Sequence, residues 1–399
     1  MEFAGKYEIV KKLDAGGMAE VYVAKSLGAA GITKTVAIKR VLPHLSSNEK
    51  FIRMFLDEAR VGMKLSHANI VQVFDVGEAQ GSYYIVMEFV KGVSLRKVLD
   101  VSAQHYRVVP VATAVHVAAE TARGLGYAHR ATDEDGHPLR IVHRDVSPPN
   151  ILLSDQGEVK ISDFGLAKAA SQLERTDPGV VKGKFSYLAP EAIDGLEVDH
   201  RADIFSLGVV LFEMLTGRRL FLGKTDYQTV QLVSRCHVPP IGLLNPQVPT
   251  LLADIVQKAL VRDRDHRYQS AEEFAEALTS FLYAASLKAT SKQVADLVAE
   301  ASGKKRRRAT VKLAQDFVRE ELLRSLSDPS APVGPSPAPD RSDSVDTRNW
   351  IDDLGLDDMA DQSHQDAAHR PPPLPGTPKT PPPPPEPSAS GFFRKFFKK

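Results

Sequence analysis

Apolar and polar residues alternate in short runs through the first ninety residues of the chain, a pattern typical of β-strands. One longer segment, residues 51–65, differs because its apolar residues recur at helical spacing, which predicts a helix. The runs that predict strands are residues 7–10, 20–26, 35–41, 71–77 and 83–90. We therefore expect a small, strand-rich lobe with one helix over residues 1–90.

The apolar period changes to that of helices over roughly the next two hundred residues. Two examples are VATAVHVAAETARGLGYAH at residues 111–129 and ADIFSLGVVLFEMLTG at residues 202–217. A strand-rich lobe followed by a larger helical lobe corresponds to the α+β fold class. We place the helical lobe at residues 91–283, so that the two lobes form one domain over residues 1–283.

The chain changes character twice more beyond this domain. The patterns SKQVADLVAEAS and ATVKLAQDFVREELLRSL flank the basic run KKRRR and predict a helical extension over residues 284–326. Residues 327–399 contain 16 of the 27 prolines, and this composition predicts a disordered, proline-rich and acidic tail. The tail ends in the basic and aromatic sequence GFFRKFFKK.

Composition narrows the class of protein. The chain has 43% hydrophobic and 25% charged residues, as soluble globular proteins do, and its net charge of +1 gives no overall attraction to nucleic acid or membrane. The single cysteine, Cys236, cannot form an internal disulfide. Neither a secretory signal nor an apolar run of the ~20 residues that a membrane helix needs is visible. We therefore expect a cytoplasmic protein.

Short motifs in the first domain carry the parts that phosphoryl transfer requires: a phosphate cradle, a cation, metal ligands and a carboxylate aimed at the acceptor. The candidate cradle is LDAGGMAEV, because small residues between two strands let backbone amides approach phosphate oxygens. Its residues are Leu13, Asp14, Ala15, Gly16, Gly17, Met18, Ala19, Glu20 and Val21. The candidate cation is Lys39 in VAIK, whose direction Glu58 on the following helix would fix by pairing with it.

The loop HRDVSPPN supplies two further candidates. Asp145 is the carboxylate that would face the acceptor, and Asn150 is a candidate magnesium ligand. A second candidate ligand is Asp163 of DFG, which follows the strand-like EVKIS. Each motif alone has an ordinary structural explanation, such as a hairpin turn or a solvated lysine. Their order along the chain, completed by APE at residues 189–191, is too specific to arise by chance.

The first 283 residues, roughly seventy percent of the chain, resemble a eukaryotic-like protein kinase domain. The sequences GGMAEV and HRDVSP are similar to those of bacterial serine/threonine kinases, especially the myxobacterial kind. The resemblance implies a two-lobed fold that binds ATP between its lobes. It implies that Asp145 orients the acceptor hydroxyl and that Asn150 and Asp163 bind Mg²⁺. Lys39, paired with Glu58, would steady the α- and β-phosphates.

Further residues receive roles only from this resemblance. Adenine would lie between Ala37 and Leu152, and Met87 would occupy the gatekeeper position beside it. Glu88 to Val90 would form the hinge between the lobes. The resemblance also assigns a buried ion pair to Glu191 and Arg267, a brace of the catalytic loop to Asp203, and the serine/threonine class to the sequence around Pro148.

Two departures from the family pattern lie in the first lobe. Asp14 and Ala19 replace the first and last glycines of the cradle, and the carboxylate of Asp14 would be unfavourable near phosphates unless it points to solvent. Gly62 stands one helical turn after Glu58, where the family usually has a bulky apolar residue. This glycine predicts a hole and a helix whose active placement is less stable than in relatives.

Two other departures lie near the catalytic carboxylate. Ser147 stands where many serine/threonine relatives have lysine, and Lys184 stands where they have threonine. A lysine that reaches in from the activation segment would supply the same charge to the γ-phosphate. We therefore count Lys184 among the candidate catalytic residues. The alternative is that Lys184 is solvated and the enzyme is slow.

The leading hypothesis is an active protein serine/threonine kinase with protein substrates, including itself, and ATP and Mg²⁺ as cofactors. The activation segment offers Ser171, Thr176 and Ser186 as acceptors. A pseudokinase scaffold is the main alternative, against which the complete catalytic set argues. A small-molecule phosphotransferase is disfavoured by the APE motif and the full activation segment, which serve peptide docking.

The C-terminal tail adds a separate hypothesis about location. As a short helix, GFFRKFFKK would place its phenylalanines on one side and its basic residues toward the other, which is typical of a weak anchor on anionic membrane. Docking of the tail into a protein groove is the alternative. Nucleic acid is not expected as a partner, and KKRRR is most simply a solvated turn. Location at the inner face of the membrane would then be peripheral.

Overall fold

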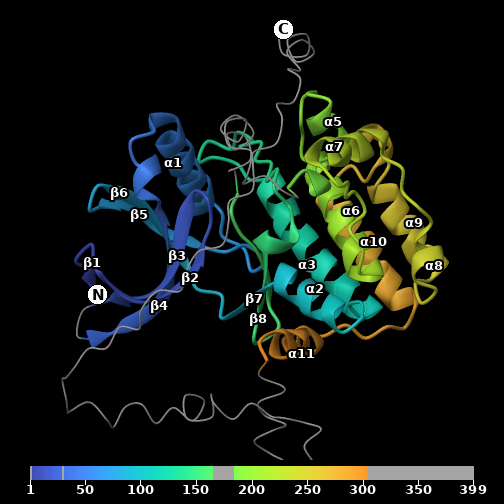
Figure 1. Ribbon diagram of the computed structural model, residues 1–399, viewed down its shortest axis with the longest axis horizontal. Helices are drawn as coiled ribbons and strands as arrows, with labels where there is room; N and C mark the ends of the chain where they lie inside the picture. The colour runs from blue at the N-terminus through green and yellow to red at the C-terminus, as the bar shows by residue number, and fades with distance from the viewer. Residues whose placement is uncertain (1, 29–30, 165–183, 304–399) are drawn as a thin grey trace, which may run out of the picture. The chain divides into compact units, whose positions relative to one another are not determined.

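The computed structural model describes residues 2–28, 31–164 and 184–303 (Figure 1). The N-terminal lobe contains an antiparallel six-stranded sheet in the order β1-β2-β3-β4-β6-β5. Its strands are β1 Glu2–Phe3, β2 Tyr7–Ala15, β3 Ala19–Leu27, β4 Thr33–Val41, β5 Val73–Ala79 and β6 Ser82–Glu88. The five strands predicted from alternation are therefore confirmed, with small shifts of their ends.

Helix α1, Glu49–Lys64, packs its apolar face against the sheet. The side chain of Asn48 caps the helix by accepting a hydrogen bond from the backbone amide of Phe51, which satisfies one of the amides at the helix start. Phe51, Met54, Phe55 and Ala59 of the helix form a buried cluster with Val41 and Ile85 of the sheet. This packing brings the polar side chain of Glu58, on the same buried face, to the centre of β4.

Strand β1 was not predicted, because two residues are too few for an alternation pattern. It is held in place by Phe3, whose ring packs edge-on against Tyr84 with the ring centroids 5.0 Å apart. The guanidinium of Arg40 lies over the same ring, 5.4 Å from its centroid. A second small cluster thus covers the face of the sheet opposite to α1.

The C-terminal lobe is built around helix α6, Arg201–Thr216, in which every residue from Ala202 to Thr216 is buried. This burial explains why the sequence of α6 is apolar on nearly all sides. Figure 1 shows the helix enclosed by its neighbours. The other helices are α2 Leu95–Gln104, α3 Val111–His129, α5 Pro190–Ile193, α7 Asp226–Arg235, α8 Ile241–Leu244, α9 Thr250–Ala259, α10 Ala271–Ala284 and α11 Ser291–Ala301.

A small antiparallel sheet belongs to this lobe, and the motif residues Asn150 and Asp163 lie next to the ends of its strands. Its strands are β7 Gly92–Ser94, β8 Ile151–Ser154 and β9 Val159–Ile161, in the order β7-β8-β9. The short 3₁₀ helices of the described residues are η2 Pro43–Leu45, η3 Pro148–Asn150, η4 Lys184–Tyr187 and η5 Arg264–His266. The predicted α+β fold with a strand-rich lobe and a helical lobe is confirmed.

The long helices predicted over residues 111–129 and 202–217 are also confirmed, as α3 and α6. SKQVADLVAEAS forms α11. The run KKRRR, the second helical pattern, the proline-rich tail, GFFRKFFKK, Ser171 and Thr176 lie outside the described residues. Within the described ranges, no helix combines the length and the apolar character needed to cross a bilayer.

Candidate functional site

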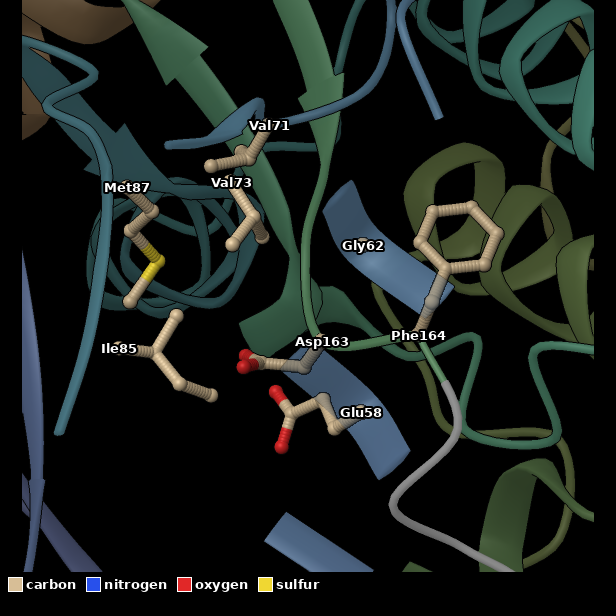
Figure 2. Close-up of a pocket in the computed structure, with 8 residues that line it drawn as sticks. All are labelled: Glu58, Gly62, Val71, Val73, Ile85, Met87, Asp163 and Phe164. Atoms are coloured by element: carbon tan, nitrogen blue, oxygen red, sulfur yellow. The ribbon is translucent and has the colours of Figure 1, made fainter. Parts of the chain in front are cut away.

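Three charged side chains from three elements meet between the lobes. Lys39 of β4 donates hydrogen bonds to Oε1 of Glu58 on α1 at 2.9 Å and to Oδ1 of Asp163, after β9, at 2.5 Å. Lys39 and Glu58 are only 9% and 7% exposed. Figure 2 shows the carboxyl groups of Glu58 and Asp163 pointing toward one another. The lysine therefore holds two carboxyl groups that would otherwise repel each other.

The pKa values of the two carboxyl groups shift in opposite directions: that of Glu58 is raised and that of Asp163 is lowered. Burial raises the pKa of Glu58 to about 8, and the negative charge of Asp163 adds to this shift against the opposing pull of Lys39. Burial also opposes ionisation of Asp163, but the charge and hydrogen bond of Lys39 lower its pKa to about 2. These shifts favour Asp163 as the ionised partner of Lys39 and disfavour ionisation of Glu58.

Oxygen Oε2 of Glu58 is buried and has no hydrogen-bond partner among the described residues. A buried carboxyl oxygen without a partner is costly when the group is ionised. Protonation removes that cost, which agrees with the raised pKa of Glu58. In the Lys39–Glu58 pair, Oε2 of Glu58 is thus still able to form a hydrogen bond.

Asp163 is fixed by its backbone and by its neighbours. Its φ angle of +63° lies in the left-handed region, which is uncommon for a residue other than glycine. The hydroxyl of Ser162 donates to Oδ2 of Asp163 at 3.2 Å, and the carbonyl oxygen of Ser162 lies 2.8 Å from Nε2 of the buried His143. The rings of His143 and Phe164 are 4.6 Å apart. Asp163 and Phe164 are therefore held against the catalytic loop.

Asp145 and Asn150 form the second half of the site. The side-chain amide of Asn150 donates to the carbonyl oxygen of Asp145 at 2.9 Å and to its Oδ2 at 3.1 Å. This leaves Oδ1 of Asn150 as a hard oxygen donor of the kind that Mg²⁺ prefers. Asn150 lies just before β8 and Asp163 just after its partner β9, and the amide of Ser162 donates to the carbonyl oxygen of Asn150 at 2.9 Å. The two candidate metal ligands thus lie at the same end of paired strands.

Asp203, at the start of α6, holds the backbone of the catalytic loop at His143 and Arg144. Its fully buried carboxylate accepts hydrogen bonds from the backbone amides of His143 and Arg144, both at 2.8 Å, and lies 2.8 Å from Nε2 of His129. Burial would raise the pKa of Asp203, but the hydrogen bond of His129 and the neighbouring positive groups lower it. Arg144 itself has a φ of +66°, so these bonds stabilise a strained conformation.

The residues expected around adenine come from both sheets. Ala37 in β4 pairs with Met87 in β6, while Leu152 lies in β8 of the small sheet. At the hinge, the backbone amide of Glu88 donates to the carbonyl oxygen of Gln72, and its side chain lies 3.1 Å from the ammonium of Lys160. Glu88, the first of the hinge residues 88–90, is therefore held by both its backbone and its side chain.

The candidate cradle is the turn between β2 and β3. The amide of Gly16 donates to the carbonyl oxygen of Ala19 at 3.0 Å and closes the turn. Asp14 is exposed, and its Oδ1 accepts from the amide of Ala15 at 2.8 Å, so this carboxylate is turned to its own backbone. The side chain of Met18 packs on the buried cluster of α1. Leu13 and Gly17 are exposed, Val21 is partly buried, and Glu20 pairs with Lys12 at 2.6 Å.

The hole expected beside Gly62 is largely filled, and that prediction is wrong in its main point. A methyl group at Gly62 would lie 2.5 Å from Cγ2 of Val73 in β5, so the valine occupies the space from the opposite side. A cavity of only about 20 Å³ remains, lined by Gly62 and Val73 together with Glu58, Val71, Ile85, Met87, Asp163 and Phe164 (Figure 2). The bulk missing from the helix is thus supplied by the strand.

The exchange predicted between Ser147 and Lys184 stays a prediction. The hydroxyl of Ser147 donates to the carbonyl oxygen of Asp145 at 3.4 Å. Lys184 begins η4, but its side chain lies outside what the structure describes. Ser186, by contrast, is only 1% exposed, and its buried hydroxyl has no hydrogen-bond partner among the described residues. Ser186 as a phosphate acceptor stays a prediction, and it would require the hydroxyl to leave this buried position.

Sequence reasoning missed a polar cluster beside η4. The hydroxyl of Tyr187 donates to Oε2 of Glu213 at 2.5 Å, and Arg96 of α2 donates to Oε1 of the same carboxylate at 3.0 Å. The signal in the sequence was Glu213, which lies in a long apolar stretch of helix α6. A second ion pair, between Glu191 and Arg267, is present as expected, with N–O distances of 2.7 and 2.8 Å.

Comparisons of the sequence with known proteins identify the family to which the chain belongs. Residues 7–281 match the protein kinase domain family. The chain is 47% identical over 278 residues to the tyrosine-protein kinase MasK of Myxococcus xanthus, covering 70% of this chain and 43% of MasK. It is 34% identical over 279 residues to the serine/threonine-protein kinase PrkC of Bacillus subtilis, covering 70% of this chain and 41% of PrkC. The chain thus spans less than half the length of these curated relatives.

The fold also matches solved structures. The PknI kinase domain of Mycobacterium tuberculosis superimposes with a TM-score of 0.53 at 26% sequence identity. This match covers 70% of the chain and 97% of the PknI domain. The matched part of the chain therefore has the extent of a complete two-lobed domain of this kind.

Proposed function

Since the chain belongs to the protein kinase domain family, in its bacterial eukaryotic-like branch, we propose that it transfers the γ-phosphate of ATP to serine and threonine hydroxyls of proteins. The observation that carries the proposal is the meeting of Lys39, Glu58 and Asp163 next to a loop in which Asn150 holds Asp145. An ion pair that only stabilises the fold would not need a second carboxylate and an Asn–Asp pair beside it.

Each residue has a role in the proposed reaction. Lys39 would bind the α- and β-phosphates, with Glu58 fixing its direction. Asp163 and Oδ1 of Asn150 offer the hard oxygens that suit Mg²⁺, which when bound would neutralise charge on the phosphates. Asp145 would orient the acceptor hydroxyl and take up its proton. The acceptor oxygen forms a bond to the γ-phosphorus as the bond from that phosphorus to the β–γ bridging oxygen breaks, and ADP leaves.

The choice of serine and threonine over tyrosine rests on two supports. PrkC and other relatives are named serine/threonine kinases, and the sequence around Pro148 is similar to that class. MasK, however, is named a tyrosine kinase, so the acceptor must be measured. The chain of 399 residues, given labelled ATP and Mg²⁺, should label itself on serine or threonine, with Thr176 as our first choice of site. Label confined to tyrosine would contradict the specificity that we propose.

The same assay distinguishes a kinase from a scaffold. Label should disappear in Asp145→Asn and in Lys39→Met. Nucleotide binding without any transfer in the unmodified chain would instead support a pseudokinase scaffold. Label that persists in both variants would mean that another group, or a contaminant, performs the chemistry.

We also propose that Lys184 supplies a charge to the γ-phosphate in place of a lysine at position 147. Lys184→Ala should lower turnover on the order of 10²-fold, as expected for loss of one contact to the transition state. The double substitution Ser147→Lys with Lys184→Thr should recover part of this loss. Unchanged turnover in a folded Lys184→Ala protein would refute the exchange.

For the tail we propose weak, reversible attachment to anionic membrane through GFFRKFFKK at the C-terminus. The supporting feature is the combination of four phenylalanines and four basic residues in nine positions. Sedimentation with vesicles that contain anionic lipid should pull down more of the full chain than of a chain ending at Ser390. Equal sedimentation of both chains would exclude the anchor.

A further inference from the structure

Helix α11 lies outside the matched kinase domain, which ends at residue 281, yet it is part of the core of the helical lobe. Its side chains Val294 and Val298 are fully buried, and Ala301 is 6% exposed. Thr290 and Gln293 form a capping box that fixes where the helix begins. The helix is therefore a built-in element of the lobe, although the family match does not include it.

The first residue of α11 rests directly on the turn between β8 and β9. A methyl group at Gly157 in this turn would lie 1.8 Å from the carbonyl oxygen of Ser291. Gly157 also has a φ of +88°, a conformation that residues with a side chain rarely adopt. The backbone of the turn thus contacts the backbone of the helix directly at Gly157 and Ser291. With no side chain between them at this point, a shift of one backbone should displace the other.

A second contact of the same kind connects this turn to the hinge. A methyl group at Gly92 in β7 would lie 1.8 Å from the carbonyl oxygen of Leu153 in β8. The amide of Asp155 donates to the carbonyl oxygen of Lys91 at 2.7 Å, and the two side chains pair at 3.3 Å. Lys91 directly follows Val90, the last hinge residue, so the contacts run from the hinge through β8 to α11.

Figure 1 shows α11 beside the labelled ends of β7 and β8 and next to α2. At its other end, Glu300 pairs with Arg107, which follows α2. The helix is thus fixed at one end to the turn between β8 and β9 and at the other end to the segment that follows α2. Leu152, one of the two residues expected against adenine, lies in β8 directly before Leu153, where Gly92 makes its close contact.

We propose that α11 is a positioning element of the nucleotide site: it holds β8 and the hinge in the arrangement that binds adenine. The inference rests on the proposed function, in that adenine is taken to bind at residues 88–90 and Leu152. Because coupling between two sites is reciprocal, displacement of α11 weakens nucleotide binding, and bound nucleotide stabilises α11. Packing alone would stabilise the lobe without this reciprocity.

Hydrogen exchange on the full chain tests the reciprocal effect. Saturating Mg·ADP, which binds without turnover, should slow exchange of the amides over residues 294–301 as well as at the hinge. The amides of α9, Thr250–Ala259, serve as a control and should not change. Protection of the hinge without protection of α11 overturns this inference alone. No protection at either place overturns the proposed nucleotide site and this inference with it.

A matched pair of substitutions tests the same idea from the other side. Val298→Ala in α11 and Val256→Ala in α9 remove the same atoms from side chains that are 0% and 1% exposed. Both should lower the melting temperature, but only Val298→Ala should raise the Kd for Mg·ADP, by about fivefold or more. Equal Kd values in the two variants would show that α11 only stabilises the lobe, and would overturn the proposal.

Discussion

The two lobes each bury an ion pair, and the pairs differ in how completely their hydrogen bonds are used. In the C-terminal lobe, Arg267 binds both oxygens of Glu191 at 2.7 and 2.8 Å and also donates to the carbonyl oxygens of Arg201, Val261 and Arg262. All its donors are thus engaged. Its guanidinium also lies over the ring of Phe205, 4.7 Å from the centroid.

In the N-terminal lobe, Lys39 binds one oxygen of Glu58, and the other oxygen has no partner among the described residues. The pair borders a small cavity and shares its lysine with Asp163. Arg267 has no N–H donor left for a new partner, so its ion pair with Glu191 stabilises one arrangement of the lobe. An unsaturated pair can change partners when phosphates and a metal ion enter, which a phosphotransferase site requires.

The largest effect should come from breaking the saturated pair. Arg267→Met would leave the buried Glu191 carboxylate without its guanidinium partner and would remove three hydrogen bonds to carbonyl oxygens, so we expect the free energy of unfolding to fall by about 3–5 kcal/mol. Urea unfolding measures this loss. Arg262→Met removes a more exposed arginine paired with Asp194 and should cost less than about 1 kcal/mol. Similar losses in both variants would contradict the distinction between the pairs.

The matching substitution in the other lobe should affect activity more than stability. Lys39→Met removes the cation that would bind the phosphates, so turnover should fall by about 10²–10³-fold. The free energy of unfolding should change much less than in Arg267→Met, because burial already disfavours ionisation of Glu58 and the side chain of Asp163, 25% exposed, keeps access to water. A loss of stability as large as that of Arg267→Met would show that the Lys39 pair is also structural.

The raised pKa of Glu58 predicts a pH dependence of stability. The folded protein holds this proton up to about pH 8, whereas the unfolded chain releases it at the ordinary pKa of a glutamate, so stability should fall as pH rises between these values. The expected slope is on the order of 1 kcal/mol per pH unit. The shifts of Asp163 and Lys39 act outside this window, below the ordinary aspartate pKa and above the ordinary lysine pKa.

Glu58→Gln provides the control for this pH dependence, since glutamine cannot titrate. The difference in unfolding free energy between the unmodified protein and Glu58→Gln should decrease from pH 5 to pH 8. Other titrating groups cancel in that difference. A difference that does not vary with pH would mean that Glu58 is ionised throughout and that its pair is as settled as that of Arg267.

The smallest effect concerns the glycine of α1. Gly62→Ala gains helix propensity but forces a methyl group against Val73, and we expect a net loss of about 1 kcal/mol. In the background of Val73→Ala the same substitution should become neutral or stabilising. A double-mutant cycle on unfolding free energies measures this coupling. Additive effects would show that the strand does not fill the space left by the helix.

Sequence reasoning identified the charged residues of the site because motif order constrains them strongly. Lys39, Glu58 and Asp163 lie far apart along the chain, yet the structure brings them within hydrogen-bond distance. It could not find the contact between Gly62 and Val73, because the volume at one position depends on a neighbour across an element boundary. The departure at Gly62 was visible, but its compensation was not.

The remaining differences have similar causes. The burial of Ser186 follows from the packing of η4 on the lobe, which no local pattern encodes. Strand β1 is too short to show a period, and α11 was predicted as a helix without any indication of where it docks. Periodicity predicts elements well, whereas contacts between elements depend on shapes that emerge only when they pack.

The carboxylate of Asp203 has a consequence for the order of folding. The backbone amide of Arg144, in its strained conformation, donates a hydrogen bond to this side chain, which itself becomes enclosed when α6 is buried. Secondary structure in α3 and α6 can therefore form early during refolding without a competent catalytic loop. Recovery of enzymatic activity should follow the slow closure of the lobe around α6, and should lag behind the return of the helical circular dichroism signal.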